Sequence, residues 1–156
     1  MAQYYIVDRM GIPQKMQDYQ IREVDWQEAQ HELKRVRESV FIVEQNVPVE
    51  QEWDGLDPDA RHVLAQSRSG EAMGTARLLP DGQIGRMAVL KEWRRLGVGS
   101  ALLEALLQIA RTRGFSKVFL NSQTRAVALY SRRGFKVASG EFMDAGIPHV
   151  RMVLHL

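Results

Sequence analysis

Apolar residues recur at three- and four-residue spacing in two long stretches of the chain, which predicts two amphipathic helices. The first follows Asp25, which begins a capping-box pattern, and is predicted to end at about Val40. The second spans residues 97 to about 113, and its apolar positions cover a wide face that indicates deep burial. A shorter helix is predicted over residues 124–133, where a glycine follows and ends it.

Short apolar or alternating segments, bounded by turn residues, predict strands. The strands at 84–89 and 117–121 flank the second long helix, so these three elements form a βαβ unit with parallel strands. The other strands are linked by hairpins, which predicts a mixed sheet in an α/β (α+β) fold. The predicted strands are residues 21–24, 62–66, 72–79, 84–89, 117–121, 136–142 and 149–154.

A long acidic segment, "FIVEQNVPVEQEWDGLDPDA", follows the first helix and is predicted to be a loop. Loops of this length in small domains are often functional. It belongs to a wider charge asymmetry, because residues 23–59 hold 11 acidic and 3 basic side chains, whereas residues 91–136 hold 10 basic and 2 acidic ones. The asymmetry indicates either two solvated faces or a basic half for a polyanion and an acidic half for a cation.

The length of 156 residues predicts a single domain over 1–156, with a core over about 21–156. The chain has no cysteine, which excludes disulfides, thiol nucleophiles and cysteine-ligated metals. No apolar run approaches the roughly 20 residues that span a bilayer, and residues 1–15 lack the pattern of a signal peptide. These features predict a cytoplasmic protein without membrane contact.

Two arginines and two glycines directly precede the second helix, in "RRLGVGSALLEALLQ". A helix start carries free N–H donors and partial positive charge, so arginines there are unfavourable unless an anion binds. The chain has no Gly-Lys pair for a P-loop, and Leu102 stands where a dinucleotide fingerprint needs its third glycine. What remains is Arg94-x-x-Gly97-x-Gly99, which indicates either a phosphate site or turn glycines alone.

Three segments resemble the GNAT superfamily of acetyl-coenzyme A-dependent N-acyltransferases: "IGRMAVLKEWRRLGVGSALL", "QTRAVALYSRRGF" and "FMDAGIPHVRMV". The second matches N-x-x-A-x-x-L-Y-x-x-x-G-F, except that Gln123 stands in the Asn position. The segment "VFIVEQNVPVEQEWDGLD" is similar to the small bacterial ElaA-like subgroup. The resemblance implies a single GNAT domain with a mixed, mostly antiparallel sheet, flanked by helices, whose splayed parallel strand pair holds coenzyme A.

The resemblance also implies how acetyl-coenzyme A is bound as the acyl donor. The N–H groups of residues 95–100 would bind the pyrophosphate, and Met87 and Val89 would pair with the pantetheine arm as an added strand. The N–H group of Val89 would also contact the acyl carbonyl. The positions implied for coenzyme A are Met87, Ala88, Val89, Arg94, Arg95, Leu96, Gly97, Val98, Gly99, Ser100, Gln123 and Tyr130.

The implied reaction is the transfer of an acetyl group to the amine of a small molecule or peptide, by direct attack on the thioester. Tyr130 matches the leaving-group acid, since a phenol with an ordinary pKa near 10 stays protonated beside a thiol near 8.5. Its helix position alone would favour a core aromatic instead, and it is the full motif around it that favours the acid. For the base, Glu44 and His149 stay open. Glu44 is favoured because its charge also attracts an ammonium, and a water chain is the third option.

Other functions are also weighed. A non-catalytic coenzyme A sensor or interaction module would use the same fold, but it would not need Tyr130 as an acid. A nucleic-acid binder is disfavoured, because the basic half lacks interleaved exposed aromatics. No metal is predicted, since the histidines lack ligand spacing. The acceptor stays open within cationic amines, and the alternating last strand would also suit a homodimer.

Overall fold

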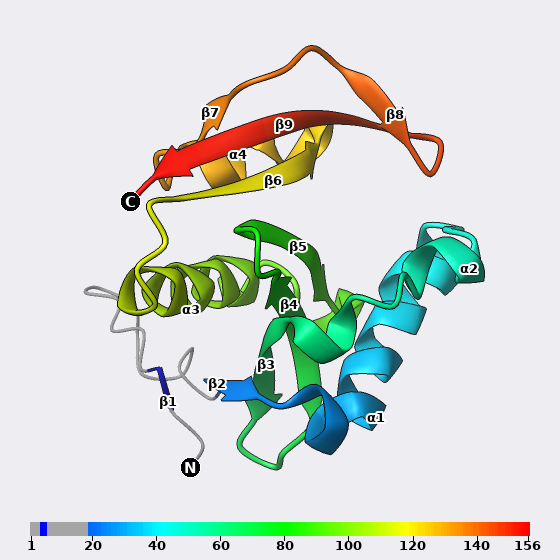
Figure 1. The fold of residues 1–156 in the computed structure, drawn as a ribbon. Helices are drawn as coiled ribbons and strands as arrows, with labels where there is room; N and C mark the ends of the chain where they lie inside the picture. The colour runs from blue at the N-terminus through cyan, green and yellow to red at the C-terminus, as the bar shows by residue number, and fades with distance from the viewer. Residues whose placement is uncertain (1–3, 6–18) are drawn as a thin grey trace.

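The computed structural model describes residues 4–5 and 19–156, whose strands form one sheet (Figure 1). The strands described are β1 Tyr4–Tyr5, β2 Tyr19–Val24, β3 Arg61–Ser67, β4 Ala72–Leu78, β5 Gln83–Val89, β6 Lys117–Gln123, β7 Lys136–Val137, β8 Phe142–Asp144 and β9 Ile147–His155. The α-helices are α1 Trp26–Arg37, α2 Val49–Glu52, α3 Val98–Thr112 and α4 Val127–Ser131. A π-helix, η2 Glu38–Glu44, and three 3-10 helices, η3 Asp57–Asp59, η4 Lys91–Trp93 and η5 Thr124–Ala126, complete the set.

The strands run in the order β1-β2-β3-β4-β5-β6-β9-β7, and β8 pairs with β9. All pairs are antiparallel except β5 and β6, which are parallel. These two strands pair only where Gln83 meets Phe119 and Ile84 meets Leu120, so within the described chain the rest of β5 has one open edge. The predicted mixed, mostly antiparallel sheet with a splayed parallel pair is confirmed.

Helices cover both faces of the central strands. In β3, Val63 and Ala65 belong to the core cluster under α3, whereas Leu64 belongs to the cluster under α1, and all three are fully buried. A strand covered on both faces carries an unbroken apolar run instead of an alternating one. The predicted wide apolar face of α3 is accordingly buried against the sheet.

The prediction that the first helix ends at Val40 is wrong, because the chain continues helically through η2 to Glu44. Here the hydrogen bonds span five residues, as in the bond from the Gln45 N–H to the Val40 carbonyl. Wider turns rotate the side chains away from the stripe that a period of 3.6 residues produces, so the apolar pattern stops before the helix does. The acidic segment predicted as a loop also holds α2 and η3.

The predicted strand over 136–142 is also wrong, since β7 and β8 are two short strands that pair with different parts of β9. Between them the Ser139 hydroxyl accepts the Arg151 N–H at 2.8 Å and replaces a ladder bond. The helix predicted over 124–133 begins as the 3-10 helix η5 and becomes α-helical at Val127. β6 extends two residues beyond its predicted end, which places Gln123 opposite His149.

No helix in residues 4–5 and 19–156 is long and apolar enough to cross a membrane. The prediction that residues 1–15 lack a signal peptide concerns a segment that, apart from Tyr4–Tyr5, lies outside the described residues. The same holds for most of the N-terminal part of the predicted 1–156 domain.

Candidate active site

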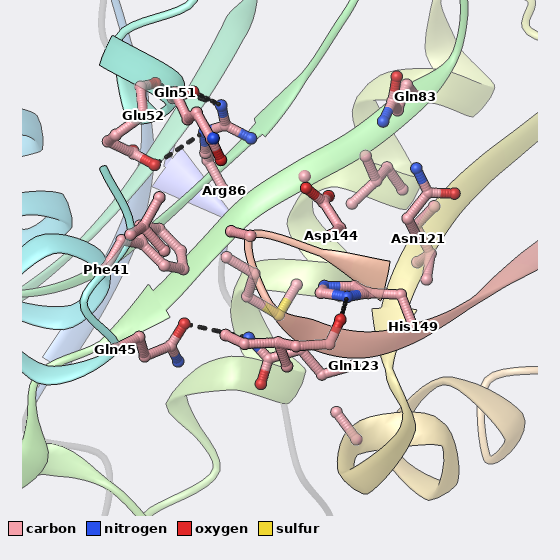
Figure 2. A pocket seen from close by; sticks show the side chains of 18 of the residues that line it. Phe41, Gln45, Gln51, Glu52, Gln83, Arg86, Asn121, Gln123, Asp144 and His149 are labelled. Atoms are coloured by element: carbon pink, nitrogen blue, oxygen red, sulfur yellow. Dashed lines mark hydrogen bonds and ion pairs between the residues drawn. The ribbon is translucent and has the colours of Figure 1, made fainter. Parts of the chain in front are cut away.

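A cavity lies where β5 and β6 separate (Figure 2). The floor comes from the two strands, and the other walls come from the end of η2, from α2, from the η5–α4 segment and from the β8–β9 hairpin. Tyr130 and His149 both line it, so the structure brings these two predicted catalytic residues to one place. The lining residues that carry side-chain polar groups are Gln45, Gln51, Glu52, Gln83, Arg86, Asn121, Gln123, Tyr130, Asp144 and His149.

The start of α3 lies directly after the loop that follows β5. Gly97 caps the helix with a φ of 82°, a left-handed conformation that favours glycine, and no side chain caps the free N–H groups. At Gly99 the fold itself does not require glycine, because an added Cβ would meet only Val89 Cγ2, at 3.9 Å. The bare amides and the spare space at Gly99 therefore fit the predicted pyrophosphate site.

Arg94 is fully engaged by the protein in this structure. Its Nε donates to the Val89 carbonyl at 2.9 Å, and its two terminal nitrogens donate to the two carboxylate oxygens of Glu44 at 2.7 Å. The guanidinium thus joins the end of β5 to the end of η2. Its hydrogen bonds hold the pKa of Glu44 below the ordinary value.

Glu44 does not line this cavity but an adjoining, more open crevice, which Gln123 and Arg125 also line. Of the two candidate bases, the structure therefore brings His149 to the cavity and holds Glu44 in an ion pair with Arg94. Sequence reasoning had no signal for this pairing, since the two residues lie 50 positions apart.

Tyr130 packs against the hydrophobic core and also lines the cavity. Its ring packs edge-on against Phe135, with centroids 6.0 Å apart, and its hydroxyl lies 3.8 Å from the sulfur of Met87 on β5. Burial raises the pKa of Tyr130 to about 12. The hydroxyl therefore keeps its proton throughout the neutral range and is available as a donor.

His149 is buried, with 8% of its surface exposed, and its ring stacks on Phe142. The Nδ1 atom lies 2.7 Å from the Ile147 carbonyl oxygen. Because a carbonyl oxygen only accepts hydrogen bonds, this contact assigns the proton of the neutral ring to Nδ1. The lone pair then lies on Nε2.

Gln123, the residue that departs from the GNAT pattern, has a carboxamide that is bound at both ends. Its Nε2 donates to the Gln45 oxygen at 3.0 Å, and its Oε1 accepts from Arg125 Nε at 2.9 Å. The Gln45 contact connects the residue directly after η2 with the end of β6 (Figure 2). The carboxamide of Gln123 thus takes part in a contact between two walls of the cavity.

Below α2 three arginines and three carboxylates form a network, in which Arg37, Arg77, Glu52 and Asp57 are buried and Arg86 and Asp54 are partly exposed. Arg37 Nε contacts Glu52 at 2.6 Å, Arg77 contacts Asp54 and Asp57, and Arg86 Nε lies 3.1 Å from Glu52. Arg86 occupies the bulge of β5 with a φ of 49° and also donates to two carbonyls of α2 (Figure 2). The network anchors the α2 wall to the sheet.

Burial and hydrogen bonding act in opposite directions on the acids of this network. Burial raises the pKa of Glu52. Burial also pushes the pKa of Asp54 upward, but hydrogen bonds from Arg77 and from the Leu56 N–H outweigh it and lower the value to about 2. Asp54 is therefore ionised across the neutral range.

Several lining residues were missed by sequence reasoning: Phe41, Gln45, Gln51, Arg86, Asn121 and Asp144. They belong to five separate segments, and although all but Asn121 lie within the quoted family-like segments, none was singled out there. Asp144 had a usable signal, because it lies in the quoted segment "FMDAGIPHVRMV", from which only His149 was selected.

A sequence profile of the Acetyltransferase (GNAT) domain matches residues 23–156. The chain belongs to the GNAT family of acetyltransferases. Over 122 residues it is 42% identical to the uncharacterized N-acetyltransferase YjcF of Bacillus subtilis, an alignment that covers 76% of this chain and 86% of YjcF. As a member of this family, the protein is an acyl-CoA-dependent N-acetyltransferase.

Solved GNAT-type structures have the same fold. A crystal structure of an acyl-CoA N-acyltransferase from Pseudomonas aeruginosa is 32% identical with a TM-score of 0.75, over 87% of this chain and 97% of that one. Escherichia coli ElaA is 27% identical with a TM-score of 0.77, over 86% and 98%. In residues 4–5 and 19–156 of the present chain, no three His, Asp or Glu residues group as metal ligands would.

Proposed function

We propose that this protein transfers the acetyl group of acetyl-coenzyme A to the amine nitrogen of a small molecule or peptide by direct attack on the thioester. The observation that carries the proposal is the cavity at the β5–β6 separation, which Tyr130 and His149 line together. A tyrosine that keeps its proton and an imidazole with a lone pair are the donor and the acceptor that this transfer needs.

Acetyl-coenzyme A would be bound by the start of α3 and by the open edge of β5. The N–H groups of residues 95–100 would bind the pyrophosphate, and the helix dipole adds partial positive charge there. Met87, Ala88 and Val89 would pair with the amides of the pantetheine arm, because this part of β5 lacks a β6 partner in the described chain. The thioester supplies an activated acetyl carbon.

We assign the two proton transfers to Tyr130 and His149. The neutral amine attacks the thioester carbon, His149 Nε2 accepts the proton that this nitrogen loses, and Tyr130 donates a proton to the sulfur as the carbon–sulfur bond breaks. The products are the acetylated amine and the free thiol of coenzyme A. Glu44 is the weaker candidate base, because Arg94 occupies both of its oxygens and lowers its pKa.

The test is thiol release from acetyl-coenzyme A over a panel of amines, with wild type and Tyr130→Phe. The variant keeps the ring packed against Phe135 but lacks the donor, so kcat is expected to fall about 10²–10⁴-fold. Coenzyme A affinity, measured by calorimetry, is expected to stay nearly unchanged. Equal turnover in the two proteins would leave Tyr130 a packing residue, and tight coenzyme A binding with no turnover on any amine would favour a non-catalytic binding protein.

A further inference from the structure

The charged residues that line the cavity differ in how their charge is balanced. Glu52 is 2% exposed and lies between Arg37 and Arg86, and Arg86 in turn contacts both Glu52 and Asp54. The charges of this wall therefore offset one another. Asp144 is different: it is exposed, and its carboxylate makes no ion pair or hydrogen bond with any residue in the described chain.

The β8–β9 hairpin holds Asp144 in a defined position. Its two turn residues, Ala145 and Gly146, have φ values of 51° and 75°, which is the left-handed pair of a type I′ turn. Asp144 is paired with Ile147, and Phe142 is paired with His149. Since alternate residues share one face of a strand, all four side chains lie on the same face of the hairpin.

Asp144 is thus the diagonal neighbour of His149, and such neighbours are about 7–8 Å apart between their Cα atoms. Figure 2 shows both residues on the hairpin side of the cavity, away from Glu52. A carboxylate directly beside the attacking nitrogen would hold its proton and slow the attack. At the diagonal position the Asp144 carboxylate can instead bind a second charged group of the same acceptor, away from the attacking nitrogen.

We propose that Asp144 binds a second cationic group of the acceptor, so that this enzyme prefers diamines and related polycationic amines to monoamines. The inference rests on the proposed acetyl transfer and adds the acceptor class to it. One ammonium is held by Asp144 and keeps its charge. The other amine lies near His149 Nε2, loses its proton and is acetylated.

The test compares matched acceptors that differ in one amino group: putrescine with butylamine, and cadaverine with pentylamine. For wild type, kcat/KM for each diamine is expected to exceed that for its monoamine about fivefold, as one partly exposed ion pair provides. Asp144→Asn is expected to remove this excess by raising the KM for the diamine, with kcat and the monoamine rates nearly unchanged. Added salt should shrink the excess in wild type only.

Glu141→Gln is the matched control, because it also removes one negative charge from an exposed residue. Glu141 lies directly before β8 and does not line the cavity. It should keep the diamine excess. Equal use of diamine and monoamine by wild type, or an equal loss for both in Asp144→Asn, would overturn the inference and leave acetyl transfer intact. If no amine increases thiol release, the proposed function itself fails, and the assignment of Asp144 fails with it.

Discussion

The two sides of the cavity are built in different ways. Apart from Gln123 and Tyr130, the side proposed to bind coenzyme A is one continuous segment, residues 83–112, which runs from β5 through the loop into α3. The other side, here called the acceptor wall, joins residues 41–52 with residues 142–149, which are far apart in the chain and include the proposed acceptor contacts Asp144 and His149. The first offers mainly backbone N–H groups, and the second offers side chains. Recognition by backbone depends on local sequence, whereas recognition by side chains depends on how distant segments pack.

The ion pairs around the cavity differ in a similar way. The Arg94–Glu44 pair is more than one-third exposed on both partners, whereas the Arg37–Glu52 pair is almost completely buried. An exposed pair contributes about 0–1 kcal/mol, but removal of one partner from a buried pair is strongly destabilising. The acceptor wall is therefore held in place by a network that tolerates little change, and Arg94 is tied more weakly.

The largest effect is expected on the acceptor side, at His149. His149→Gln should lower kcat/KM about 10²–10⁴-fold, because the lone pair that accepts the proton of the amine is lost. Glu44→Gln should keep kcat/KM near the wild-type value, since this carboxylate is held by Arg94. The measurement is kcat/KM for wild type and both variants with the best amine of the panel.

A large loss of kcat/KM in Glu44→Gln alone would return the role of base to Glu44. Wild-type kcat/KM in both variants would favour a water chain. Either outcome would also change the comparison between the two sides, because the acceptor side would then not supply the base from His149. Glu44 contacts Arg94 and does not line the cavity that holds His149.

On the coenzyme A side, the expected effect is on binding and not on chemistry. Gly99→Val should weaken coenzyme A affinity about 10- to 100-fold, as expected when one hydrogen bond to a charged phosphate is lost. The fold should tolerate the change, because the space around Gly99 is open except for Val89. Calorimetry measures the affinity, and thermal unfolding checks the fold.

Gly140→Val is the matched control, since an added Cβ at this position meets nothing within 4 Å. It should leave coenzyme A affinity unchanged. If folded Gly99→Val binds coenzyme A like wild type, the start of α3 is not the pyrophosphate site.

The smallest effect concerns the network that anchors the acceptor wall. The pKa of Asp54 is about 2 in the folded protein, below the ordinary 3.8, so the folded state binds this proton less readily than the unfolded chain. Its contribution to stability is therefore complete above about pH 4 and is lost as the pH falls towards 2. Urea unfolding at a series of pH values measures this slope.

Asp54→Asn should flatten the slope over this window, whereas Asp59→Asn, on an exposed residue of η3, should keep it. An unchanged slope in Asp54→Asn would mean that Arg77 and Arg86 do not stabilise the ionised carboxylate. The α2 wall would then be held without Asp54, by the pairs that Arg37 makes with Glu52 and Asp57.

Local patterns were reliable where one element decides its own structure. The apolar stripe of α3 was predicted to within one residue at each end, and the βαβ unit required the parallel pairing of β5 and β6. Patterns failed at η2, where the helix continues with five-residue hydrogen bonds, and at β7 and β8, where a serine side chain interrupts the ladder. In both places the departure from regular geometry leaves no trace in the alternation of apolar and polar residues.

The sequence by itself determined the mixed sheet, the helices that bury it and the glycine-bearing start of α3, because short-range periodicity and turn chemistry specify these features. Only the tertiary structure decided that Arg94 binds Glu44, that Gln45 reaches Gln123, and that Asp144 shares a face with His149. These contacts depend on strand register and on the packing of distant segments. The motif for coenzyme A was therefore readable in the chain, whereas the surface offered to the acceptor was assembled by the fold.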